Sequence, residues 1–159
     1  MVRSRRLLVA LGTVGSVTVV GCSQPSDQQD GVRHATFTYT CCRHADVAQV
    51  RHPGDVIRLH WIVSPGPPSA SRDPVPMRLE ASLSGPYPSV GKLKAAPASA
   101  PAAMADPIRT TDRAGGTPVS TLVIPDDAVT GFYNLRTAVE SHGGRASGAS
   151  IIRVVPGGS

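Results

Sequence analysis

Apolar and polar residues alternate in short runs along this chain, and a period of two predicts β-strands. In residues 77–84, MRLEASLS, every second side chain is apolar, which is typical of a strand with one buried face. Residues 55–63 follow a Pro-Gly-Asp turn and point four apolar side chains to one face: Ile57, Leu59, Trp61 and Val63. The sequence therefore predicts two half-buried strands here.

Further runs continue the pattern, and none has the 3.6-residue period of a long helix. Residues 35–41 alternate with threonine in a way that points Phe37, Tyr39 and Cys41 to the core. Three more strands are expected at residues 120–124, 131–140 and 149–155. In the last two, the side chains expected to face the core are Tyr133, Leu135, Thr137, Val139, Ile152 and Val154. One open sheet would bury too little apolar surface, so we expect two facing sheets.

Residues 94–117 break this alternation. The segment is rich in Pro and Ala at its start and in Gly at its end. A connection of this length is unusual inside a compact domain. We expect a mobile loop that contains one short strand near residues 107–111.

Residues 124–135, IPDDAVTGFYNL, resemble the corner before the penultimate strand of bacterial immunoglobulin-like domains. Five positions match in order: Pro125, Ala128, Gly131, Tyr133 and Leu135. Gly permits a tight approach to the strand, and the hydroxyl of an inward Tyr can reach a nearby backbone group. The resemblance implies an all-β, immunoglobulin-like antiparallel β-sandwich of about seven strands, with Trp61 as a core anchor. The inter-sheet disulfide of such domains is missing, because Cys41 and Cys42 are adjacent.

The first 22 residues predict that the protein is targeted to a membrane. Arg3, Arg5 and Arg6 precede an apolar run, residues 7–20, that is too short and too interrupted to span a bilayer permanently. The run leads into VVGC, which resembles the lipobox of bacterial lipoproteins. By that resemblance the chain is cut before Cys22, and the Cys22 thiol carries acyl chains such as palmitate.

The lipobox resemblance divides the chain into three parts and assigns a compartment. We expect a lipoprotein signal peptide at residues 1–21, a lipidated, flexible tether at residues 22–33 and the β-sandwich at residues 34–156. The expected location is the cell membrane, with the protein lipid-anchored on the extracytoplasmic face. Arg5 and Arg6 fit a twin-arginine signal and an ordinary secretory signal equally well.

The balance of charged residues argues against nucleic acid as a partner. The formal net charge of +5 includes three arginines of the predicted signal peptide, and without them 13 basic side chains stand against 11 acidic ones. This balance is ordinary and lacks the concentrated basic patch that nucleic acids require. Arginine far outnumbers lysine, and Ala, Gly, Pro and Val are abundant. That usage resembles lipoproteins of high-GC, actinobacterial-type genomes.

The adjacent pair Cys41 and Cys42 is the most unusual feature of the expected domain. Cysteines of exported proteins usually pair. Neighbouring Cα atoms lie about 3.8 Å apart across a trans peptide, below the usual disulfide range of about 4.4–6.8 Å, so a bond between these two would be strained and easily reduced. With Cys41 inward, Cys42 is expected outward. Three interpretations stay open. Cys41 is a buried packing residue and Cys42 a spare or vicinally paired thiol, or the two form a redox-labile vicinal disulfide, or Cys42 forms an intermolecular disulfide.

A metal site is a second interpretation of the same region. Cys42 and His44 are two residues apart and share a face if the strand continues, and His52 and His60 lie on the neighbouring run. Thiolate and imidazole ligands suit copper(I) or zinc. However, the sequence has no C-x-x-C, H-x-H or Met cluster, and isolated histidines are usually surface or hydrogen-bonded groups.

Catalysis is not expected, because the sequence has no G-x-S-x-G, H-E-x-x-H or P-loop pattern. The expected function is a lipid-anchored, non-catalytic binding module of the cell envelope, with an envelope or secreted protein or a surface ligand as partner. A metal-binding or redox-responsive lipoprotein is the alternative. Tyr87 and an outward Phe132 would mark a contact surface if they met at one end of the sandwich. The expected contact elements are the loops Ser64–Pro76, Gly85–Lys92 and Lys94–Thr117.

Overall fold

The computed structural model describes residues 32–157. The predicted signal peptide, the predicted lipidation site Cys22 and almost all of the predicted tether lie outside the described residues. Strands make up 48% of the structure and helices 8%, which confirms the all-β class. No helix within residues 32–157 is both long enough and apolar enough to span a membrane.

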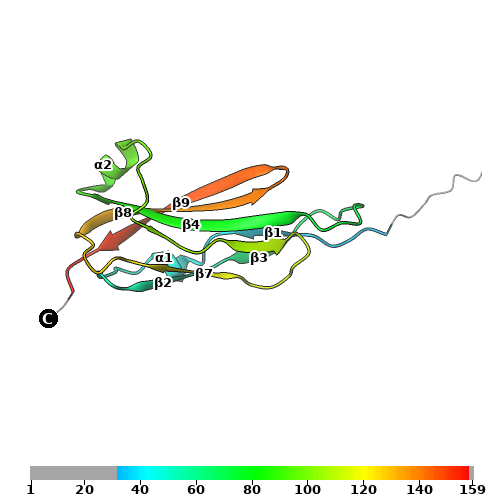
Figure 1. Cartoon of the computed structure of the whole chain (residues 1–159), viewed down its shortest axis with the longest axis horizontal. Coiled ribbons are helices and arrows are strands. Elements are labelled where there is room, and N and C mark those ends of the chain that lie inside the picture. Colours follow the sequence, from blue (N-terminus) through cyan, green and yellow to red (C-terminus); the bar gives the residue numbers. More distant parts are fainter. Residues whose placement is uncertain (1–31, 158–159) are drawn as a thin grey trace, which may run out of the picture. The chain divides into compact units, whose positions relative to one another are not determined.

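One layer of the sandwich is built on three long antiparallel strands. These are β4 (Pro76–Tyr87), β8 (Gly131–Ser141) and β9 (Gly144–Val154), with β8 in the middle. Two short strands, β5 (Ala103–Met104) and β6 (Ile108–Thr111), pair one after the other with the free edge of β4. Figure 1 shows β4, β8 and β9 running over the other strands as one sheet.

The second layer consists of two strand pairs: β1 (Phe37–Thr40) pairs with β3 (Ile62–Pro65), and β2 (Val56–His60) pairs with β7 (Val119–Val123). Only Trp61 separates β2 from β3, so the two form one interrupted strand.

Counted with β2–β3 and β5–β6 as single positions, the described residues fill seven strand positions. In this count β1, β2–β3 and β7 are the first, second and fifth positions and form one layer. The strands β4, β5–β6, β8 and β9 are the third, fourth, sixth and seventh positions and form the other layer. This is the antiparallel arrangement of an immunoglobulin-like sandwich, with the fourth position on the opposite layer from that in constant-type immunoglobulin domains.

The alternation predicted from the sequence is confirmed in the core. Most side chains expected inward are almost fully buried in the two clusters between the layers: Ile57, Leu59, Trp61, Leu79, Ala81, Leu83, Tyr133, Leu135, Ile152 and Val154. Val63 and Val139 are only partly buried at the edge of the second cluster, and Phe37 is half-buried and belongs to neither cluster. Trp61 is the predicted anchor and is 1% exposed. Its ring N–H donates to Ser120 Oγ at 2.9 Å, so the only polar atom of the buried ring has a partner.

The corner before β8 also follows the sequence prediction. The Tyr133 hydroxyl donates to the Val129 carbonyl at 2.7 Å, closing the corner that precedes the strand. A Cβ at Gly131 would lie 2.9 Å from the Tyr87 carbonyl oxygen, which is why a residue without a side chain is needed there. At the other predicted turn, Gly54 has a φ of 82°, and Gly adopts that conformation without steric cost.

Two short helices correct the sequence expectation. The helix α1 (His44–Val47) stands where a continued strand was considered, and α2 (Val90–Ala95) begins inside a predicted loop. Ser89 caps α2 by accepting from the Lys92 backbone N–H at 3.2 Å, and Leu93 is buried where α2 contacts β4 and β8. Helices of four and six residues are too short to produce a recognisable period.

The segment 94–117 is more ordered than a loop. The expected short strand near residues 107–111 is present as β6. A second strand, β5, was not expected; next to it, the N–H groups of Ala102 and Ala105 donate to the Leu83 and Ala81 carbonyls at 2.7 and 3.0 Å. A two-residue strand of small residues leaves no alternation to detect.

The Tyr133 corner gives a direct test of fold stability. Tyr133→Phe removes the hydroxyl and leaves the Val129 carbonyl without this donor, so we expect a loss of about 1 kcal/mol in the free energy of unfolding, measured by urea denaturation. Tyr87→Phe is the matched control, since the Tyr87 hydroxyl meets only the exposed Ser99 hydroxyl at 3.0 Å. Equal effects of the two substitutions would contradict a specific role for the corner.

Candidate functional site

Cys41 and Cys42 are joined by a disulfide at the end of β1. Both are partly buried and pack against the main core cluster. The expectation that Cys42 points outward is therefore wrong. The strand ends at Thr40, so the alternation of faces does not extend to residue 42.

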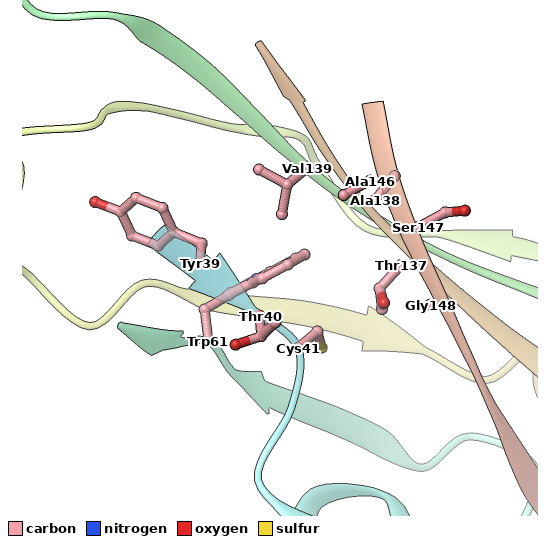
Figure 2. Close-up of a pocket in the computed structure, with 10 residues that line it drawn as sticks. All are labelled: Tyr39, Thr40, Cys41, Trp61, Thr137, Ala138, Val139, Ala146, Ser147 and Gly148. Atoms are coloured by element: carbon pink, nitrogen blue, oxygen red, sulfur yellow. The ribbon is translucent and has the colours of Figure 1, made fainter. Parts of the chain in front are cut away.

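Beside the disulfide lies a cavity of about 120 Å³, here called the inner cavity. Figure 2 shows Tyr39, Cys41 and Trp61 on one side of it and the β8 and β9 side chains on the other. The residues that line it from β8 and β9 are Thr137, Ala138, Val139, Ala146, Ser147 and Gly148. The inner cavity therefore lies between the two layers, at the flank where β1 and β9 are the edge strands.

Two of the histidines proposed as metal ligands contact different carboxylates. His60 Nδ1 lies 3.0 Å from Asp46 Oδ1, and His52 Nδ1 lies 3.6 Å from Asp55 Oδ2. His44 is exposed at the start of α1. Among residues 32–157, no three His, Cys, Asp or Glu side chains come together in a way that suits a metal ion.

Asp46 is the buried charged group of this region. It is 9% exposed and also accepts a hydrogen bond from the His60 backbone N–H at 2.8 Å. Burial by itself raises the pKa of Asp46, but the hydrogen bonds and the charge of His60 outweigh it, so the pKa lies below the ordinary 3.8. The pair fixes α1 against β2 and thereby holds the chain that follows the disulfide.

A larger hollow, here called the outer groove, lies on the outward face of the five-stranded sheet. Its volume is about 440 Å³. Its floor comes from β4, β8 and β9, and its wall comes from the segment predicted as a contact loop, through Ser99, Pro101, Met104 and Pro107. Met104 is 65% exposed, so the wall presents an apolar side chain to the groove.

Positive charge dominates the strands around the outer groove. Their outward positions hold two glutamates, Glu80 and Glu140, against five arginines: Arg78, Arg109, Arg136, Arg145 and Arg153. Arg78 and Arg145 contact Glu80 at 2.9 and 2.8 Å. In the part of the chain that the structure describes, no carboxylate forms an ion pair with Arg136.

Tyr87 and Phe132 lie together at one end of the sandwich, as expected for a contact surface, because they are cross-strand partners at one end of β4 and β8. Both are half-buried. Phe132 lines a further hollow of about 330 Å³ with Arg153. The sequence named these aromatics and the loop, but not the outer groove. Its floor combines strands that are distant in sequence.

The Asp46–His60 pair predicts a pH-dependent contribution to stability. Because the folded pKa is lowered, the contribution is present above about pH 4 and disappears as the pH falls through the folded pKa. We expect Asp46→Asn to lower the free energy of unfolding by about 1–3 kcal/mol at pH 7 and by much less at the lowest pH at which the protein folds. Asp106→Asn, at an exposed position, is the control. A pH-independent deficit measured by thermal denaturation would contradict this assignment.

No protein-family model matches the chain, and no curated protein matches it. Sequence similarity therefore assigns no activity, ligand or partner to the sites described above. The interpretation of the inner cavity, the Asp46–His60 pair and the outer groove rests on their residues and geometry.

Proposed function

We propose that this protein is a lipid-anchored binding module of the bacterial cell envelope and that it works without catalysis. The observation that carries the proposal is the outer groove, a hollow of about 440 Å³ walled by the Pro- and Ala-rich segment. Ligand sites commonly measure about 300–1,000 Å³ and combine apolar walls with a few polar groups. Its partner is an envelope or secreted protein, or a ligand on the cell surface.

The chemistry of the outer groove favours a ligand that carries a carboxylate or another anion. Arg136 offers a planar, permanently charged donor set, and bidentate binding of a carboxylate suits it. Met104 supplies apolar contact beside it. Arg145 lines the same groove and is already paired with Glu80, so Arg136 is the arginine that a ligand would meet first.

Two observations support a non-catalytic role. His60 is the histidine with the closest carboxylate, yet within residues 32–157 no Ser or Cys side chain hydrogen bonds to it. Ser89 and Lys92 have the S-x-x-K spacing of some Ser–Lys hydrolases, a pattern wrongly taken as absent when the sequence was searched for catalytic motifs. Ser89 Oγ instead caps α2, and both residues are exposed.

Attachment to the membrane is proposed from the sequence alone. The VVGC lipobox places the anchor at Cys22, ahead of a short polar segment. One lipid-modified terminus and a flexible tether would leave the outer groove free to meet a partner at the cell surface.

Site-specific photo-crosslinking in cells tests the binding proposal. With a photoreactive residue at position 104, we expect discrete cross-linked products that are lost with Arg136→Glu, because charge reversal repels an anionic ligand. The same probe at position 58, on the outward face of the other layer, is the matched control. Identical products from both positions, or none from position 104, would contradict the proposal.

The anchor is tested by fractionation of the same cells. Cys22→Ser should move the protein from the membrane pellet to the soluble fraction and abolish labelling by a fatty-acid analogue, because the acylated thiol is gone. The Cys41→Ser/Cys42→Ser variant is the control and should stay in the membrane. Retention of the Cys22→Ser protein in the pellet would rule out this anchor.

A redox role is the second candidate, and the position of the Cys41–Cys42 disulfide beside the inner cavity favours it. A dithiol would transfer two electrons and two protons to the disulfide, leaving two thiols and becoming a disulfide itself. Deprotonated thiols are ligands for copper(I) or zinc, with His44 the nearest histidine in sequence. His52 and His60 already contact Asp55 and Asp46.

Trp61, the single tryptophan of the chain, reports on this chemistry. In a Cys22→Ser background, added dithiothreitol should change Trp61 emission and make two thiols per chain available to alkylation, as measured by mass spectrometry. The Cys41→Ser/Cys42→Ser variant should show neither change. Two alkylated thiols without any dithiol would mean that the pair is not a disulfide in solution.

A further inference from the structure

The outer edge of β9 is the longest stretch of unpaired strand backbone in the described domain. β9 has 11 residues and pairs on one side with β8. On its other side only the last residues have a partner, where Arg51 N–H donates to the Arg153 carbonyl and Val155 N–H to the Arg51 carbonyl, both at 2.9 Å. Residues 144–149 are all exposed.

The ladder fixes which groups this edge presents. In an antiparallel pair, successive residues direct their backbone N–H and C=O groups alternately to one neighbour and to the other. The Arg153 carbonyl points to the free edge, where it accepts from Arg51. The backbone N–H and C=O groups of every second residue before it point to the same edge: Arg145, Ser147, Ala149 and Ile151. Within residues 32–157 no backbone hydrogen bond reaches these outward groups. They form a template for one more strand.

A furrow runs beside this edge. Two hollows adjoin there, the inner cavity of about 120 Å³ and a second of about 470 Å³, and they share Tyr39, Val139 and Ala146. We call them together the flank furrow. Most of the β9 residues that line it are small: Gly144, Ala146, Ser147 and Gly148, with Arg145 as the exception. Trp61 lines the inner cavity from the other layer. An added strand would place alternate side chains over the flank furrow and fill it.

The outward face beside the edge is positively charged. Ala149 is the cross-strand partner of Arg136, and its small side chain leaves the side of Arg136 open toward the edge. An added strand would lie beside β9, two strand spacings or about 10 Å from β8, and the long Arg136 side chain together with an acidic side chain can bridge that distance. Arg145 lies on the same face, one residue after the β8–β9 turn.

We propose that β9 accepts an extended, acidic segment of a partner protein as an additional strand, with alternate apolar side chains in the flank furrow and carboxylates toward Arg136. This inference rests on the proposed binding function and names the chemistry of its partner. Main-chain hydrogen bonds would supply affinity, and the flank furrow and the arginines would supply selectivity. A second copy of this chain is disfavoured, because pairing β9 with β9 would join two arginine-rich faces.

The test uses the protein as it is purified from the producing cells, in detergent, with a dye-labelled peptide of four Glu-Val repeats. We expect binding by fluorescence anisotropy and protection of residues 145–152 from hydrogen exchange. The matching peptide of four Lys-Val repeats should bind at least about tenfold more weakly, because it brings like charges together.

Two substitutions separate the edge from the furrow. Ala149→Pro removes an outward N–H while leaving the ladder to β8 intact, and Ala146→Leu fills the flank furrow; each should weaken peptide binding at least about tenfold. Ala95→Leu, at an exposed position of α2, is the control. If Ala149→Pro does not fold, Ala146→Leu decides the question alone.

The outcomes are distinct. No binding of the Glu-Val peptide, equal binding of both peptides, or binding unchanged by Ala146→Leu would overturn the inference. A peptide-free dimer that Ala149→Pro dissociates would also overturn it, since the occupant would be a second copy. Cross-links from position 104 that persist in the Ala149→Pro variant would leave the proposed binding function standing while this inference falls.

Discussion

The packing of the two layers depends on Trp61. Its ring is buried with Tyr39 and Leu79, its ring N–H donates to Ser120, and its backbone N–H donates to the Pro118 carbonyl at 3.0 Å. The residue also divides one long strand into β2 and β3, so that β2 pairs with β7 and β3 with β1. A large ring with every donor satisfied therefore sets both the core and the pairing of the second layer.

The same arrangement leaves one flank of the sandwich incomplete. At the Val154 end, α1 and the Arg51 bridge cover the space between the layers, and the Asp46–His60 pair holds α1 in place. Toward Gly144 no element continues this cover within the described residues, and the small side chains of β9 leave the flank furrow open. The Cys41–Cys42 disulfide lies where the covered part meets the open part, so redox chemistry there and strand addition along β9 would affect the same cavity.

The outward face of the five-stranded sheet is the positively charged surface of the domain. Arginines outnumber glutamates on it, although the chain as a whole is close to balanced after the predicted signal peptide is set aside. Charge is concentrated by strand order, because residues from β4, β6, β8 and β9 are brought side by side. Both the outer groove and the β9 edge present this surface, which is why an acidic partner suits each of them.

The sequence by itself determined the all-β class, the strands other than β5, most of their buried faces and the Tyr133 corner. Period-two alternation and turn chemistry are local properties, so Leu79, Leu135 and Ile152 were assigned correctly from their neighbours. The tertiary structure decided the rest. It turned Cys42 toward the core, gave His52 and His60 different carboxylate partners, and built the outer groove and the flank furrow from segments far apart in sequence. Cavities and charged faces depend on which strands become neighbours, and no local pattern records that choice.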